Sequence, residues 1–166
     1  GYIEQLDDEL LRISKESFDA LSFNCYALSP DHEKMNHALE ISGLPMIIGE
    51  YHFGTVDRGL AQSLWQVNSQ KERGDAFRYY TENAFAHRGL IGTGWFRWID
   101  QNINGRTDGE NYNCGFIDVT DRPYPYMVDA AIKTAKSLYE IHSGTKTPFH
   151  QAPNAVGHSP IPDLWE

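Results

Sequence analysis

The hydrophobic pattern of this chain alternates between two periods. Apolar positions three and four residues apart predict helices over residues 3–15, 32–42, 71–87 and 126–142. Short apolar runs bounded by polar residues, glycine or proline predict strands over residues 18–26, 46–51 and 90–98. Because strands that alternate with helices pair in parallel through right-handed crossovers, we expect an α/β fold whose three strands lie side by side, in chain order.

The ends of these elements carry their own signals. Asp31 is a candidate N-cap, Gly43 ends the same helix, and Pro125 suits the first turn of the last helix. The apolar face of that last helix is expected to comprise Val128, Ala131, Ile132, Ala135 and Leu138. Long polar loops over 53–69 and 100–123 follow the second and third strands. Since parallel strands end at one edge of a sheet, we expect both loops on the same rim.

The number of strands limits the architecture. A closed eight-stranded barrel needs about 250 residues, and this chain has 166. It is therefore either a small open sheet or the last part of a barrel. We expect one α/β unit over residues 1–144 and an irregular, proline-bearing tail over 145–166.

Composition narrows the class of partner. The chain has 23 acidic and 14 basic residues and a formal net charge of −9, which disfavours nucleic acid and anionic membrane surfaces. A neutral substrate fits this charge better. Aromatic residues make up 13% of the chain, enough to pack a core and also to supply stacking platforms for sugar rings. The two cysteines, Cys25 and Cys114, are too few for a disulfide scaffold and match no zinc motif, so we expect buried thiols and no cofactor.

The sequence carries no apolar run long enough to span a bilayer and no signal peptide. It begins at Gly1 and inside an expected helix, so we expect the natural N-terminus to lie upstream. The location of the protein in the cell is therefore left open by the residues themselves.

A carboxylate directly follows the most apolar strand. Met46 to Gly49 are all apolar or small, which is typical of a parallel strand covered on both faces, and Glu50 comes next. Since an unpaired buried charge is costly, we expect Glu50 where the strand ends and a pocket opens. Catalytic residues emerge at this end of barrel strands. A structural carboxylate held by an arginine or by backbone N–H groups is the alternative.

Five short motifs follow one another along the chain. They are IGEYHFG at 48–54, DRG at 57–59, GWF at 94–96 with Asp100, GRTDGENY at 105–112, and DRPYP at 121–125. In this order they resemble the C-terminal end of the β-agarase-like glycoside hydrolases, which belong to a clan of retaining glycosidases built on a (β/α)8 barrel. The resemblance covers residues 18–142. It implies a partial (β/α)8 (TIM) barrel made of the last three βα units.

The resemblance also implies a role for Glu50. In the clan the nucleophile is a glutamate at the end of the seventh strand, which corresponds to Glu50, and Trp95 matches an aromatic residue placed under the reacting sugar. The acid/base glutamate of the clan lies at the end of the fourth strand, usually after an asparagine. This sequence has no Asn-Glu dipeptide and no fourth strand, so the resemblance implies a fragment without its acid/base. It also suggests a secreted or periplasmic protein.

Further side chains are candidates for holding a sugar. An ionised nucleophile needs hydrogen-bond donors, and Tyr26 or His52 could supply one; His52 is otherwise a core histidine. Asn24 is either a ligand or a strand-end cap. Arg106 and Asn111 lie in a polar loop that either binds sugar or braces itself through ion pairs.

The sequence thus predicts a fragment of a retaining glycoside hydrolase, β-agarase-like or β-galactosidase-like, that acts on a galactan-type polysaccharide. Its expected partners are the oligosaccharide or polysaccharide substrate and either the missing N-terminal part of the barrel or a self-associated copy. A non-catalytic carbohydrate-binding or structural remnant is the alternative. A metal-dependent hydrolase using Glu50, His52 and Asp57 is a weaker one, because these residues match no established metal-ligand spacing.

Overall fold

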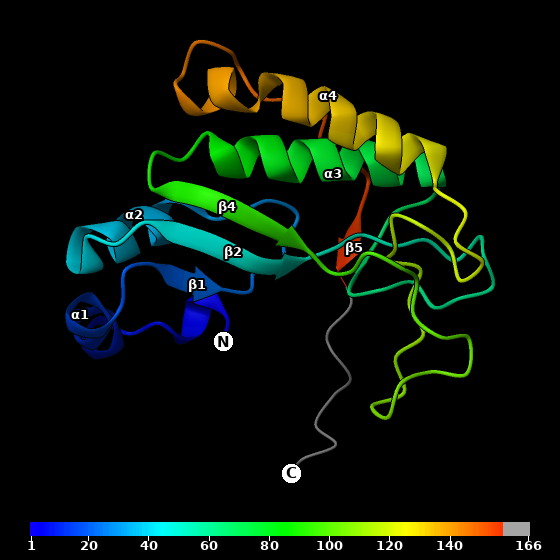
Figure 1. Cartoon of the computed structure of the whole chain (residues 1–166), viewed down its shortest axis with the longest axis horizontal. Helices are drawn as coiled ribbons and strands as arrows, with labels where there is room; N and C mark the ends of the chain where they lie inside the picture. The colour runs from blue at the N-terminus through cyan, green and yellow to red at the C-terminus, as the bar shows by residue number, and fades with distance from the viewer. Residues whose placement is uncertain (158–166) are drawn as a thin grey trace.

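The computed structural model describes residues 1–157 and has a three-stranded parallel sheet at its centre (Figure 1). Its strands are β1 (Leu21–Phe23), β2 (Met46–Tyr51) and β4 (Leu90–Trp95), in the order β1-β2-β4. Both pairs of neighbours are parallel. The predicted α/β class, strand order and strand direction are confirmed.

Within residues 1–157, five helical segments accompany this sheet, and α3 and α4 lie side by side along it (Figure 1). They are η1 (Ile3–Gln5), α1 (Asp8–Ser17), α2 (His32–Ser42), α3 (Gln70–Phe85) and α4 (Pro125–His142). The Asp31 side chain accepts hydrogen bonds from the first turn of α2, and Gly43 ends that helix with φ of 66°. Pro125 is the first residue of α4. The predicted helix ends are therefore confirmed here.

The first predicted helix and two predicted strands are shorter than expected. The helix over 3–15 is divided, because the Asp7 side chain accepts from the Leu10 N–H and starts α1 afresh. The strand over 18–26 keeps only three residues in the sheet, since the Asn24 N–H turns to the Gly1 carbonyl, although the Cys25 N–H still donates to the Glu50 carbonyl of β2. The strand over 90–98 ends at Trp95.

One face of the sheet is buried and the other is open. Phe23, Met46, Ile48 and Leu90 are at most 1% exposed and belong to the main core cluster. Ile47, which alternates with them on β2, is half-buried. The expectation that residues 46–49 are covered on both faces is wrong for the described chain, because the helices supply a layer on one face.

The buried face of α4 differs from the predicted one by one position. Its buried residues are Met127, Ala130, Thr134, Ser137 and Ile141. Val128 and Ile132, both expected in the core, are 37% and 49% exposed. The physical reason is polar pairing: the Thr134 hydroxyl donates to the buried Glu82 carboxylate at 3.0 Å, so a polar stripe packs on α3.

The two long loops meet at the carboxyl end of the sheet, as predicted (Figure 1). The Ala61 N–H donates to the Asn111 carbonyl at 3.1 Å, and the Asn113 N–H donates to the Ala61 carbonyl at 3.3 Å. The first loop also contains β3 (Trp65–Gln66), which pairs antiparallel with β5 (Val156–Gly157).

The tail holds no helix or strand over residues 145–155 and contributes only the two-residue strand β5, and residues 158–166 lie outside the described part. The boundary between residues 144 and 145 stays a prediction. Over residues 1–157, no helix combines the length and the apolar character needed to cross a bilayer.

Candidate active site

Glu50 lies near the carboxyl end of the central strand β2 and is half-buried. Its Oε2 accepts a hydrogen bond from the Tyr26 hydroxyl at 2.9 Å. Asn24 lies beside the preceding residue, Gly49, whose added Cβ would lie 3.0 Å from the Asn24 Oδ1. The next residue, Tyr51, turns instead toward the helices and stacks on Tyr80 at 4.0 Å between ring centroids. The β2–β4 register shifts between Ile48 and Tyr51, so the alternation is interrupted there, and Glu50, next to the inward-facing Tyr51, lies on the open face of the sheet.

Tyr26 is the donor that an ionised Glu50 needs. Burial, and then the negative charge of Glu50, raise the pKa of Tyr26 above its ordinary value. The phenol therefore keeps its proton at neutral pH, so it can donate to the carboxylate.

His52 is committed to two main-chain partners. The ring is 2% exposed, its Nδ1 lies 3.0 Å from the Phe96 carbonyl oxygen, and its Nε2 accepts from the Leu64 N–H at 3.1 Å. A carbonyl only accepts, so Nδ1 carries the proton. Burial lowers the pKa of His52 to about 3. Neither nitrogen is left to bind a sugar or a metal. This argues against the two roles suggested by the sequence, a polar group of the sugar site and a metal ligand.

Aromatic rings extend the site beyond His52. Tyr26 meets the imidazole edge to face at 4.8 Å between centroids, and Phe96 and Tyr112 lie at 5.9 and 5.8 Å. The Arg106 guanidinium lies 5.7 Å from the centroid of the Phe96 ring. Glu50, Tyr26, His52 and Phe96 are called the Glu50 cluster below. Sequence reasoning missed Phe96, although it sits inside the GWF motif.

Arg106 and Asn111 belong to a loop that braces itself. The Arg106 guanidinium pairs with Asp108 at 2.7 Å and with Glu110 at 3.4 Å. Asn111 contributes its main-chain carbonyl to the contact between the two loops. These contacts favour the self-bracing alternative, and a sugar contact by either side chain stays a prediction.

Trp95 lies on the helix side of the sheet end. Its indole N–H donates to the Cys114 carbonyl at 2.6 Å. Its ring packs against Tyr51, Phe77 and Phe116 at 5.2 to 5.8 Å between centroids. These partners belong to the core layer, so they favour packing, and the sugar platform stays a prediction.

A second polar cluster lies fully buried behind the rim. The Arg73 side chain, from α3, is 0% exposed. One of its terminal nitrogens donates to the Gln70 and Asn113 side-chain oxygens at 2.9 and 3.0 Å, and the other donates to the Gly115 carbonyl. The guanidinium also lies 4.7 Å from the centroid of the Tyr124 ring.

Asp100 is the carboxylate of this cluster. It accepts from the Tyr124 hydroxyl at 2.6 Å, the Gly115 N–H at 2.7 Å, and the Asn113 amide at 3.0 and 3.1 Å. Arg73, Gln70, Asp100, Asn113 and Tyr124 form the Arg73 cluster. The cluster attaches α3 to the loop over 100–123 and thereby fixes that loop at the carboxyl end of the sheet. Sequence analysis did not find it, because an arginine within a helix usually reads as a surface residue.

Comparison with known proteins identifies the segment. No family model matches the chain. It is 40% identical over 128 residues to beta-agarase A and 38% identical to beta-agarase B, both of Vibrio sp. (strain JT0107). A solved exo-beta-agarase superposes with a TM-score of 0.78 at 36% identity, over 83% of this chain and 19% of that one. The chain is homologous to a segment of the beta-agarases.

The match is to a part of each relative. It takes in 73% of this chain and 13% of either curated beta-agarase. The predicted resemblance to this family is confirmed, and the chain is an agarase-like glycoside hydrolase segment.

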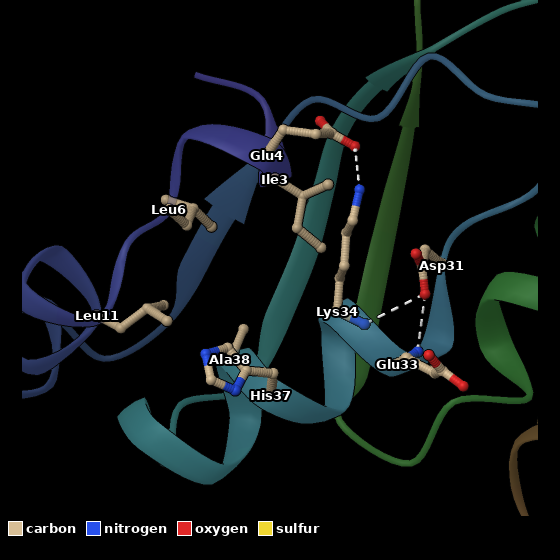
Figure 2. A pocket seen from close by; sticks show the side chains of 9 residues that line it. All are labelled: Ile3, Glu4, Leu6, Leu11, Asp31, Glu33, Lys34, His37 and Ala38. Atoms are coloured by element: carbon tan, nitrogen blue, oxygen red, sulfur yellow. Dashed lines mark hydrogen bonds and ion pairs between the residues drawn. The ribbon is translucent and has the colours of Figure 1, made fainter.

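A surface hollow of about 410 Å³ lies elsewhere on this agarase-like segment, between η1, α1 and α2 (Figure 2). Lys34 reaches across it to Glu4 at 3.2 Å, and Asp31 turns into the first turn of α2 (Figure 2). His37 bonds Asp8 at 2.9 Å. Since these polar groups are already paired, the Glu50 cluster is the better candidate site. Within residues 1–157, no three or more His, Cys, Asp or Glu side chains are grouped to hold a metal ion.

Proposed function

We propose that this chain is the C-terminal part of a retaining (β/α)8-barrel glycoside hydrolase that cleaves an agarose-type galactan, with Glu50 as nucleophile. The observation that carries the proposal is the placement of Glu50. It stands at the carboxyl end of the central parallel strand, faces the open side of the sheet, and accepts a hydrogen bond from Tyr26. The homologous beta-agarases, by their name, supply the substrate class.

The chemistry needs a second carboxyl group. In a retaining glycosidase two carboxyls lie about 5–5.5 Å apart, one attacking the anomeric carbon and the other protonating the leaving oxygen. Glu50 would form the glycosyl ester, which water then hydrolyses with the second residue acting as base. We propose that this acid/base comes from outside the chain, so the 166-residue chain alone should not turn over agarose or an aryl glycoside.

Exposed apolar side chains support the need for further strands and helices. Ile91 at the edge of the sheet is 57% exposed, and Tyr139 on α4 is 88% exposed. At the opposite edge, Ile13 and Phe18 are 51% and 63% exposed. We propose that the remaining barrel units of a longer protein cover both edges. A self-associated copy of this chain is the other occupant, and size-exclusion chromatography of the purified chain separates the two.

The direct test is a chimera in which this chain replaces the matching segment of beta-agarase A of Vibrio sp. (strain JT0107). The chimera should release sugar from agarose, and Glu50→Gln should lower turnover by several orders of magnitude while the protein stays folded. Glu40→Gln, an exposed glutamate on α2, is the matched control and should change neither.

A folded chimera that binds agarose but does not cleave it would favour the non-catalytic carbohydrate-binding alternative. Turnover by the Glu50→Gln chimera close to that of the parent would remove the nucleophile assignment.

A further inference from the structure

The proposed reaction uses Glu50 and Tyr26 but assigns no role to His52. His52 is nonetheless the best-connected side chain of the Glu50 cluster. Its Nδ1–H donates to the Phe96 carbonyl just beyond the end of β4, and its Nε2 accepts from Leu64 in the loop after β2. One imidazole thus ties together two segments that are far apart in sequence.

The ring also supports the residue that holds Glu50. Tyr26 packs its ring on His52 edge to face at 4.8 Å, and its hydroxyl reaches Glu50 at 2.9 Å. Tyr26 lies on the segment after β1, at the edge of the sheet, where its main-chain neighbours are few compared with those of β2. Without the imidazole the Tyr26 ring would lose the surface that fixes its direction.

Steric evidence shows how closely this part of the rim is packed. A Cβ on Gly54, two residues after His52, would lie 2.0 Å from the Ser63 Oγ. Ser63 itself has φ of 73° and is followed by Leu64, whose N–H meets the imidazole. The loop is therefore bent at a position where its next N–H group points at His52.

We propose that His52 is a positioning residue. Hydrogen bonds at its two ring nitrogens fix the orientation of its imidazole, and the imidazole in turn holds Tyr26 against Glu50. His52 makes no bond to the sugar. The inference rests on the proposed function only where it concerns turnover. The hydrogen-bond state of His52 can be measured without any activity.

The first arm of the test is NMR of the purified chain labelled with 15N at its seven histidines. The proposal expects His52 to be neutral and protonated at Nδ1 from pH 5 to 8. The surface residue His37, whose side chain is 57% exposed, is the control for the signal of a solvent-exposed imidazole. A charged His52, or one protonated at Nε2, overturns the proposal.

The second arm is a double-mutant cycle in the chimera, which does not depend on the isolated chain folding. Tyr26→Phe and His52→Leu should each lower kcat by about 10- to 100-fold with little change in KM, because each loosens the same hydrogen bond to a carboxylate. The double variant should be no slower than Tyr26→Phe alone. His52→Asn, which keeps a donor near the Nδ1 position, should be faster than His52→Leu.

Three kinetic results contradict the proposal. In the first, the double variant loses kcat by the product of the two single losses. In the second, His52→Leu raises KM and leaves kcat unchanged. In the third, His52→Asn is no faster than His52→Leu. An inactive parent chimera refutes the proposed function instead, and the NMR arm then still decides the state of His52.

Discussion

The Glu50 cluster and the Arg73 cluster share one rim of the sheet, yet they are built in opposite ways. Arg73, Asp100 and Asn113 are at most 3% exposed, and each makes two or more polar contacts within the protein. Glu50 is half-buried, and Tyr26 donates to its Oε2. The Arg73 cluster therefore leaves no group to meet a substrate, whereas the Glu50 carboxylate remains accessible from the open face.

We therefore expect the Arg73 cluster to contribute mainly to folding stability and the Glu50 cluster mainly to chemistry. A buried charge must be matched by partners, so removing one member of the Arg73 cluster leaves another uncompensated. A half-exposed carboxylate with a single donor adds little to folding, but it can attack a substrate. The predictions below test this division from the largest expected effect to the smallest.

The Arg73→Met substitution should lower the free energy of unfolding by about 3–5 kcal/mol, because the Gly115 carbonyl loses its guanidinium donor and buried Asp100 loses a nearby positive charge. Glu50→Gln should change it by less than about 1 kcal/mol. Urea unfolding of both variants beside the parent measures the contrast. Equal losses for the two would erase the distinction between the clusters.

Tyr26→Phe should lower turnover of the chimera by about 10- to 100-fold, since a hydrogen bond to a charged group contributes roughly 1.5–3 kcal/mol. Tyr79→Phe, a half-buried tyrosine on α3, is the control and should keep parental turnover. Initial rates on agarose under saturating conditions are the measurement. A Tyr26→Phe enzyme as fast as the control would separate Tyr26 from the reaction.

His52 makes the stability of the Glu50 cluster depend on pH. Its pKa is about 3 in the folded protein against an ordinary value of 6.5, mainly because of burial. Between these values the unfolded chain binds a proton that the folded chain does not, so stability falls as the pH drops from 6.5 toward 3. The slope from this one group is at most about 1.4 kcal/mol per pH unit.

Unfolding measured at several pH values in the parent and in His52→Gln isolates this slope. Burial also lowers the pKa of His87, which acts in the same direction in both proteins. The variant should therefore lose part of the acid sensitivity. An unchanged difference between pH 6.5 and pH 4 speaks against a neutral buried His52.

The Arg106→Ala substitution should have the smallest effect on folding, less than about 1 kcal/mol, because its ion pairs are exposed to solvent. Thermal unfolding at low and high salt measures it, with Lys133→Ala on α4 as a matched surface control. If Arg106→Ala instead raised KM of the chimera many-fold, the loop would be a sugar-binding element as well as a brace.

The residues at the strand ends were enough to predict Glu50 as the centre of the candidate site. An apolar run followed by Glu50, with polar residues near the strand ends, predicted Tyr26 or His52 as the donor, and in the structure Tyr26 is the one that bonds Glu50. The caps at Asp31 and Gly43 were equally accessible, since they depend on local backbone chemistry.

The remaining features depend on which way a side chain points. Trp95 and Phe96 are adjacent, and the register between β2 and β4 shifts twice, so strand parity could not tell which ring faces the site. The face of α4 was predicted one residue away because Thr134 is buried for its bond to Glu82. Arg73 and Asn113, 40 positions apart, meet only in the folded chain.

The most direct measurement of the central claim is product analysis of the Glu50→Gly chimera with agarose-derived oligosaccharide and added azide. A small anion can occupy the space of the missing carboxylate and attack the anomeric carbon from the same side. We expect cleavage to return with azide and to yield the glycosyl azide of inverted configuration. If azide restores no cleavage and yields no azide adduct, while the variant is merely less stable and keeps residual activity, Glu50 is a structural residue and not the nucleophile.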